Sequence, residues 1–137
     1  MERVRADAVD GLTVADVMHD EFEALPSSAT VADVRRWFAT SASRRLALLA
    51  GGRRYAGSLT PLDVADEAVD ASTPAIELAA AGPTLAPDAP AAAGRDLVIE
   101  TASRRVPVVD GDGGLLGVLA MTRDLQFFAC RAPARET

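Results

Sequence analysis

The stretch Ser43-Arg44-Arg45-Leu46-Ala47-Leu48-Leu49 returns 60 residues later as Ser103-Arg104-Arg105-Val106-Pro107-Val108-Val109. The same shift, without a gap, aligns Gly57 with Gly117 and Gly51 with Gly111. Matches between alanines carry little weight in a chain this rich in alanine. A Ser-Arg-Arg block and glycines at constant spacing carry more, and they indicate an internal duplication.

Each copy predicts the same order of elements. Thr30 precedes apolar residues at helical spacing, which is typical of a helix start, and the apolar run 45–50 is typical of a buried strand. In the first copy the expected elements are a short helix at 13–18, an extended piece at 23–26, a helix at 30–41, strands at 45–50 and 55–60, and a helix at 61–69. The second copy predicts strands at 105–110 and 115–121, a turn at 111–114 and a last helix through Cys130. Its middle helix is less clear because Gly94 lowers helix propensity.

These patterns predict a mixed α/β fold built from two repeats, at 12–70 and 71–130, with a mobile tail at 131–137. The linker between the copies is too short for independent domains, so we expect one compact module with pseudo-twofold symmetry. A chain of 137 residues can bury a sizeable core without disulfides or metals.

Charge and composition narrow the function classes. With 14 basic and 20 acidic residues the net charge is −6, so nucleic acid and anionic membranes are poor partners. Every basic residue is arginine, and the arginine and alanine bias is typical of a GC-rich genome. No apolar run approaches the roughly 20 residues that span a bilayer, and the single cysteine favours the cytoplasm.

No catalytic or metal site is predicted. His19, the only histidine, has no second histidine or cysteine at ligand spacing. No nucleophile–base pair or carboxylate cluster can be identified either, so we expect no enzyme and no required cofactor.

Three stretches make the chain resemble a tandem pair of CBS domains, the Bateman module, of the stand-alone bacterial type. The opening 13–18, followed by Leu25-Pro26 and Thr30-Val31, is similar to the family's start. Arg105-Val106-Pro107-Val108-Val109-Asp110 is similar to its second strand. Residues 57–64 match its strand-to-helix ending, in which a threonine or serine is followed three positions on by an aspartate. The likeness covers roughly residues 12 to 129.

The resemblance implies a regulatory module with two clefts between the repeats. Many members hold AMP, ADP, ATP or S-adenosylmethionine there, sense the ligand and change shape. They commonly dimerise, so the resemblance also implies a homodimer and a regulated protein that the sequence does not identify. Apolar residues suited to the dimer contact lie on the helices that end each repeat: Leu62, Val64, Val69, Leu125, Phe127 and Phe128.

Four residues of the first copy are candidates for nucleotide contact. The Asp63 carboxylate can accept hydrogen bonds from two ribose hydroxyls. Thr60 offers a hydroxyl and an amide near phosphate, and Arg44 offers a planar guanidinium for phosphate oxygens. Leu25 would line the slot for the base. Thr60 and Asp63 fit a helix cap equally well, and Arg44 also fits a solvated or surface-paired side chain.

The second copy carries the counterparts Leu85, Arg104, Thr122 and Asp124. Arg104 stands three residues before Pro107, where the family often has its phosphate-contacting basic residue. Under the 60-residue shift Asp63 aligns with Arg123, so Asp124 lies one position further along the chain. A bulge in the preceding strand would bring its side chain back to the cleft. We therefore expect the Asp63 site to be the better one, and the Asp124 site to be degenerate or empty. The alternative function is an interaction module with degenerate clefts and no small ligand.

Overall fold

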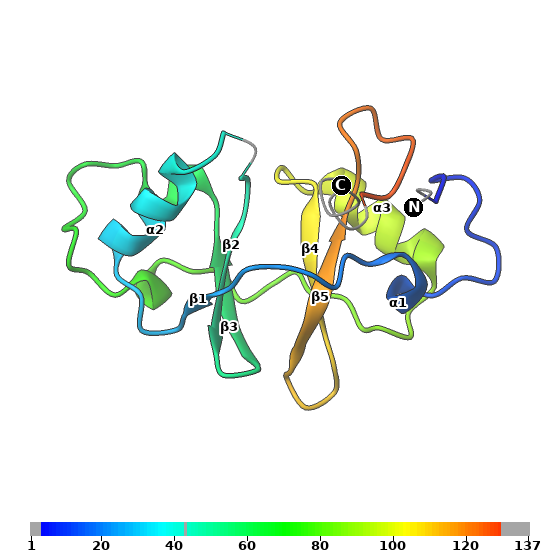
Figure 1. Cartoon of the computed structure of the whole chain (residues 1–137), viewed down its shortest axis with the longest axis horizontal. Coiled ribbons are helices and arrows are strands. Elements are labelled where there is room, and N and C mark those ends of the chain that lie inside the picture. Colours follow the sequence, from blue (N-terminus) through cyan, green and yellow to red (C-terminus); the bar gives the residue numbers. More distant parts are fainter. Residues whose placement is uncertain (1–3, 43, 130–137) are drawn as a thin grey trace, which may run out of the picture. The chain divides into compact units, whose positions relative to one another are not determined.

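The computed structural model describes residues 4–42 and 44–129. They form two compact units, one made by the chain up to Phe22 together with the part from Thr84 onward, the other by Glu23–Pro83. Each unit combines helices with a small sheet (Figure 1), which confirms the mixed α/β class. The expected tail at 131–137 lies outside the described residues.

The unit Glu23–Pro83 contains a three-stranded sheet in the order β1-β2-β3. β1 runs parallel to β2, and β2 runs antiparallel to β3. The elements are β1 (Leu25–Pro26), α2 (Val31–Ala39), β2 (Ala47–Gly51), β3 (Arg54–Leu59), and the 3₁₀ turns η1 (Pro61–Val64) and η2 (Ala75–Glu77). The core holds Val31 and Val34 of α2 against Ala47 and Leu49 of β2, because alternate residues of a strand share one face.

The start of α2 is the predicted cap. The Thr30 hydroxyl accepts a hydrogen bond from the Asp33 amide at 3.2 Å, and an Asp33 carboxylate oxygen accepts one from the Thr30 amide at 2.9 Å. This reciprocal box satisfies two amides that the first helical turn leaves without partners.

The other unit contains the antiparallel pair β4 (Arg105–Val109) and β5 (Leu115–Ala120) with α3 (Ala91–Glu100) and α1 (Val14–Val17). Figure 1 shows α1 beside α3, although they are far apart in the sequence. Val14 of α1, Val98 of α3 and Leu119 of β5 are fully buried in one cluster. The predicted hairpin turn between the strands is confirmed, since Asp110 accepts hydrogen bonds from the amides of Asp112 and Gly114.

The two units have the same arrangement under the 60-residue shift, except that one segment of each unit comes from a different part of the chain. Arg35 donates to the carbonyl of Asp66 at 2.9 Å, and Arg95, its repeat counterpart, donates to the carbonyl of Ala6 at 2.8 Å. Ala6 lies 60 residues before Asp66. The start of the chain therefore occupies in its own unit the place that residues 64–69 occupy in the unit Glu23–Pro83. Val9 is buried in the core accordingly.

Two predicted helices are wrong. The expected helix at 61–69 is a single turn, Pro61–Val64, and Arg35 instead binds the carbonyls of Val64, Asp66 and Val69. The expected last helix is absent from the described residues up to 129, where the chain turns back and Ala129 bonds to Ala120. Cys130 lies outside the described residues.

These changes also reduce the apolar face expected for a dimer. Val64 and Phe128 are 5% and 0% exposed and belong to the cores of their own units. Leu62 is 85% exposed. Among the six apolar residues predicted for dimer contact, Leu62 is therefore the one most available to a partner.

The middle helix of the second copy is well formed despite Gly94. A Cβ at this position would lie 2.7 Å from Leu119 Cδ2 and 2.9 Å from Val14 Cγ2. The glycine that weakens the helix by propensity is thus the residue that lets α3 approach β5 and α1 closely.

Candidate functional site

Three of the candidate residues of the first copy, Arg44, Thr60 and Asp63, lie at one end of the β1-β2-β3 sheet. Ala47, at the start of β2, pairs with Leu59, at the end of β3. Arg44 before β2 and Thr60 after β3 therefore lie at the same end. β1 is parallel to β2, so the residues that precede Leu25 reach this end as well.

Thr60 and Asp63 form a capping box at the start of η1. One Asp63 carboxylate oxygen, Oδ2, accepts hydrogen bonds from the Thr60 amide at 2.7 Å and from its hydroxyl at 3.1 Å. The capping interpretation is confirmed. The other oxygen, Oδ1, accepts no hydrogen bond from any residue in the described part of the chain, and the side chain is exposed. One oxygen thus positions the carboxylate while the other faces solvent.

Arg44 is paired. Its Nη2 lies 2.8 Å from Glu23 Oε1, and its guanidinium carbon lies 4.2 Å from the centroid of the Trp37 ring. Both contacts are favourable, since the carboxylate neutralises the cation and the indole face attracts it. The Arg44 side chain is 25% exposed and that of Glu23 is 70% exposed. The surface-paired alternative is the arrangement that the structure shows.

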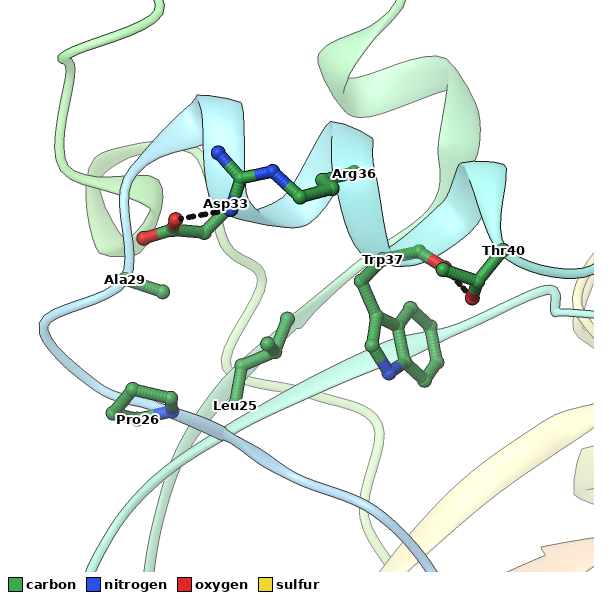
Figure 2. A pocket seen from close by; sticks show the side chains of 7 residues that line it. All are labelled: Leu25, Pro26, Ala29, Asp33, Arg36, Trp37 and Thr40. Carbon is green, nitrogen blue, oxygen red and sulfur yellow. Dashed lines mark hydrogen bonds and ion pairs between the residues drawn. The ribbon is translucent and has the colours of Figure 1, made fainter.

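Leu25 lines a shallow groove of about 440 Å³ between β1 and α2. Figure 2 shows its side chain pointing toward the helix, next to the indole of Trp37. The apolar walls come from Leu25, Pro26, Ala29 and Trp37. The polar rim comes from Asp33, Arg36 and Thr40, with Arg36 bonded to Asp33 at 3.1 Å. The Thr30 amide, the Thr30 hydroxyl and Arg36 hold the pKa of Asp33 below its ordinary value, so its carboxylate is charged at neutral pH.

The counterparts in the second copy are arranged differently. Leu85 pairs with β4 through its amide and carbonyl, which bond to Pro107 and Val109. Arg104 has a positive φ of 57°. Thr122 donates to Asp124 Oδ1 at 2.7 Å, and the Gln126 amide donates to the same oxygen at 3.1 Å. Asp124 therefore stabilises its own turn.

A bulge does occur in each hairpin, but not where it could advance Asp124. The register shifts between Leu49 and Ala50 in the first copy, and between Val108 and Val109 in the second. From Gly117 to Ala120 the pairing of β5 continues without a shift. Thr122 and Asp124 consequently stay displaced relative to Thr60 and Asp63.

Two further residues, Trp37 and Glu23, belong to this cluster and have no clear signal for it in the sequence. Trp37 is half-buried and packs against the core of its unit, and it also forms both the groove wall and the surface under Arg44. Glu23 was not considered, because its partner is 21 residues away and only the parallel pairing of β1 and β2 joins them. For Trp37, the only indication in the sequence was its place on the apolar face of α2.

The described residues offer no metal site, since none of their histidine, cysteine and acidic side chains form a cluster of three or more. Over the same part of the chain no helix has the length and apolarity needed to cross a membrane.

Comparison with known proteins relates part of the chain to a family and most of the chain to a fold. Residues 68–123 match the family model described as "CBS domain". No curated protein matches the sequence significantly. Residues 68–123 are thus similar to a CBS domain, and the structures below show that the chain has the fold of a CBS pair.

Three solved structures illustrate the likeness. The CBS domains of a transcriptional regulator from Streptococcus pneumoniae match with a TM-score of 0.69 at 22% identity, over 85% of this chain and 98% of that one. A CBS domain protein from Pyrobaculum aerophilum, in complex with AMP, matches with a TM-score of 0.68 at 22% identity. The match covers 83% of this chain and 95% of that protein. The cystathionine β-synthase pair domain of a proposed Mg²⁺ transporter from Shewanella oneidensis matches with a TM-score of 0.70 at 18% identity. The match covers 79% of this chain and 64% of that chain, so this chain spans less than two thirds of its length. At these identities the likeness shows the fold.

Proposed function

We propose that this chain is a non-catalytic regulatory module that binds an adenosine nucleotide. The observation that carries the proposal is that Arg44 before β2 and the Thr60–Asp63 pair after β3 lie at the same end of the β1-β2-β3 sheet. A guanidinium for phosphate and an exposed carboxylate oxygen for ribose hydroxyls are two of the groups that such a ligand requires. The Pyrobaculum aerophilum protein, which shares the fold, was solved with AMP.

The proposal includes AMP, ADP, ATP and S-adenosylmethionine as candidate ligands. It also includes a homodimer, a regulated partner protein and a cytoplasmic location, as expected from the sequence. Leu25 and the apolar groove beside Trp37 support an apolar wall for a base in the same unit.

A second candidate function is an interaction module without a small ligand. The displacement of Thr122 and Asp124 relative to Thr60 and Asp63 favours it for the second copy, because no bulge in the described residues of β5 brings these side chains to the corresponding positions. Ala47 stands where the second copy has Pro107, which is a further departure from the family pattern.

The two candidates are distinguished by thermal unfolding of the chain with each adenosine ligand. A ligand that binds only the folded state adds about 2.7 kcal/mol at a hundredfold excess over its dissociation constant, a shift of several degrees at this size. We expect such a shift for at least one ligand. The absence of any shift would leave the interaction module.

Asp63→Ala tests the site, and Asp16→Ala is its matched control. Asp16 caps α1 through the same two hydrogen bonds from Thr13, at 2.8 and 3.1 Å. Both substitutions remove a cap, which costs about 1 kcal/mol. Only Asp63→Ala should also abolish the ligand-induced shift; equal ligand shifts in both variants would exclude Asp63 from the site.

A further inference from the structure

We propose that Glu23 is a built-in competitor for the guanidinium of Arg44, so that a ligand phosphate reaches this cation by displacing the Glu23 carboxylate. The inference deepens the proposed function and rests on it. It assigns to Glu23 a control over how strongly the site prefers phosphate-bearing ligands to uncharged ones.

The contact between the two side chains is direct. Arg44 Nη2 and Glu23 Oε1 are 2.8 Å apart, within the range of a charge-assisted hydrogen bond. Phosphate and carboxylate oxygens seek the same guanidinium N–H groups, so the two anions compete for Arg44. A phosphate that bound beside a retained Glu23 carboxylate would also meet its negative charge.

Glu23 can leave this position at little cost. Its side chain is 70% exposed, so solvent can receive the carboxylate when it swings away. Ion pairs with an exposed partner contribute little to folding stability. The pair is therefore suited to exchange.

Trp37 keeps Arg44 in place during that exchange. The guanidinium lies over the indole ring at 4.2 Å, and this contact does not depend on Glu23. The Nη2 group of the same guanidinium still reaches a carboxylate oxygen, so the ring contact is compatible with binding an anion. A cation held in advance loses less side-chain freedom when it binds phosphate.

The arrangement belongs to one copy only. The 60-residue shift places Pro83 opposite Glu23 and Leu97 opposite Trp37. Neither residue can pair with a guanidinium as glutamate and tryptophan do. Arg104, the counterpart of Arg44, forms no ion pair or ring contact with any side chain in the described part of the chain.

Glu23→Gln tests the inference, because it removes the competing charge and keeps the shape of the side chain. Glu67→Gln is the matched control, since Glu67 is an exposed carboxylate of the same unit that forms no ion pair within the described residues. Trp37 is the only tryptophan, so its fluorescence reports events at Arg44 directly. The probes are AMP, adenosine and inorganic pyrophosphate.

We expect Glu23→Gln to bind AMP and pyrophosphate about three- to tenfold more tightly than the unaltered chain, the size of one weak exposed ion pair and the repulsion it adds. Adenosine affinity should not change, and Glu67→Gln should behave as the unaltered chain. Arg44→Gln should remove the preference for phosphate in both backgrounds.

The outcomes separate the inference from the proposed function. AMP binding that Glu23→Gln leaves unchanged or weakens would overturn the inference and leave the function standing. Failure of AMP to bind, with pyrophosphate bound more tightly by Glu23→Gln, would exclude AMP as the ligand and support the competition. Binding of neither AMP nor pyrophosphate to either chain would exclude AMP and overturn the competition. Unfolding curves of Glu23→Gln and Arg44→Gln establish that each variant is folded.

Discussion

Gly94→Ala sets two physical effects of opposite sign against each other. In an exposed helix interior, alanine in place of glycine is favourable by about 1 kcal/mol. In α3 the new Cβ would lie 2.7 Å from Leu119 Cδ2 and 2.9 Å from Val14 Cγ2, distances that packed atoms do not adopt. Both neighbours are 0% exposed and have no space to move into. Overpacking of this kind costs about 1–3 kcal/mol.

The difference predicts that Gly94→Ala lowers the free energy of unfolding by about 1 kcal/mol, the overpacking cost less the propensity gain. The assay is urea denaturation followed by circular dichroism. Ala93→Gly is the control, because residue 93 is exposed on the same helix and reports propensity alone, with an expected loss of about 1 kcal/mol. An increase in stability for Gly94→Ala would refute the close approach of α3 to β5 and α1.

Three further predictions concern hydrogen bonds, charge and packing within the two units. Arg35→Met should lower the free energy of unfolding by about 2 kcal/mol in denaturant titration, because three backbone carbonyls lose a charged donor, whereas the exposed Arg36→Met should change it by less than about 0.5 kcal/mol. Hydrogen bonds lower the pKa of Asp33 in the folded chain, so its carboxylate stabilises the fold at pH values above the ordinary carboxyl pKa. This stabilisation is lost as the pH falls through the lowered pKa of the folded state. NMR titration should show the lowered pKa, and Asp33→Asn should make acid unfolding less steep. Val9→Ala should cost about 2 kcal/mol in the same denaturant titration, as two buried methyl groups are removed, while a negligible loss would mean that the chain start does not complete the core.

The strands were predictable because their signals are local. The run expected at 45–50 is the strand Ala47–Gly51, and the run expected at 105–110 is Arg105–Val109. Short apolar stretches bounded by glycine turns depend on few distant contacts for their register. The caps at Thr13, Thr30 and Thr60 were predictable for the same reason, since each is formed with an aspartate three residues away.

The helix expected at 61–69 failed because a distant side chain competes for its backbone. Arg35 donates to the carbonyls of Val64, Asp66 and Val69, which lie 29 to 34 residues further along the chain. The sequence correctly indicates a helical start at Pro61, but no local pattern can show that a guanidinium from another element binds the carbonyls that follow. Tertiary contacts of this kind routinely override propensity.

The sequence predicted which residues are candidates for the site, but it did not predict which of them contact one another. The spacing of Thr60 and Asp63 identified a pair without deciding between a cap and a ligand contact. The structure shows that one carboxylate can serve the cap through one oxygen and leave the other exposed. The pairing of Arg44 with Glu23 follows from the parallel register of β1 and β2, which no local pattern encodes.

The exchange of opening segments explains why the compact units differ from the sequence repeats. A Cβ at Gly57 would meet Ala79 and Ala80 at 2.9 and 3.3 Å, and a Cβ at Gly117 would meet Met18 and His19 at 2.9 and 2.8 Å. The start of the second copy thus covers the last strand of the first, and the start of the first covers the last strand of the second. Neither stretch 12–70 nor 71–130 contains the residues that cover its own last strand. The duplication therefore makes the two copies depend on each other for complete cores, which favours retention of the pair over either copy alone.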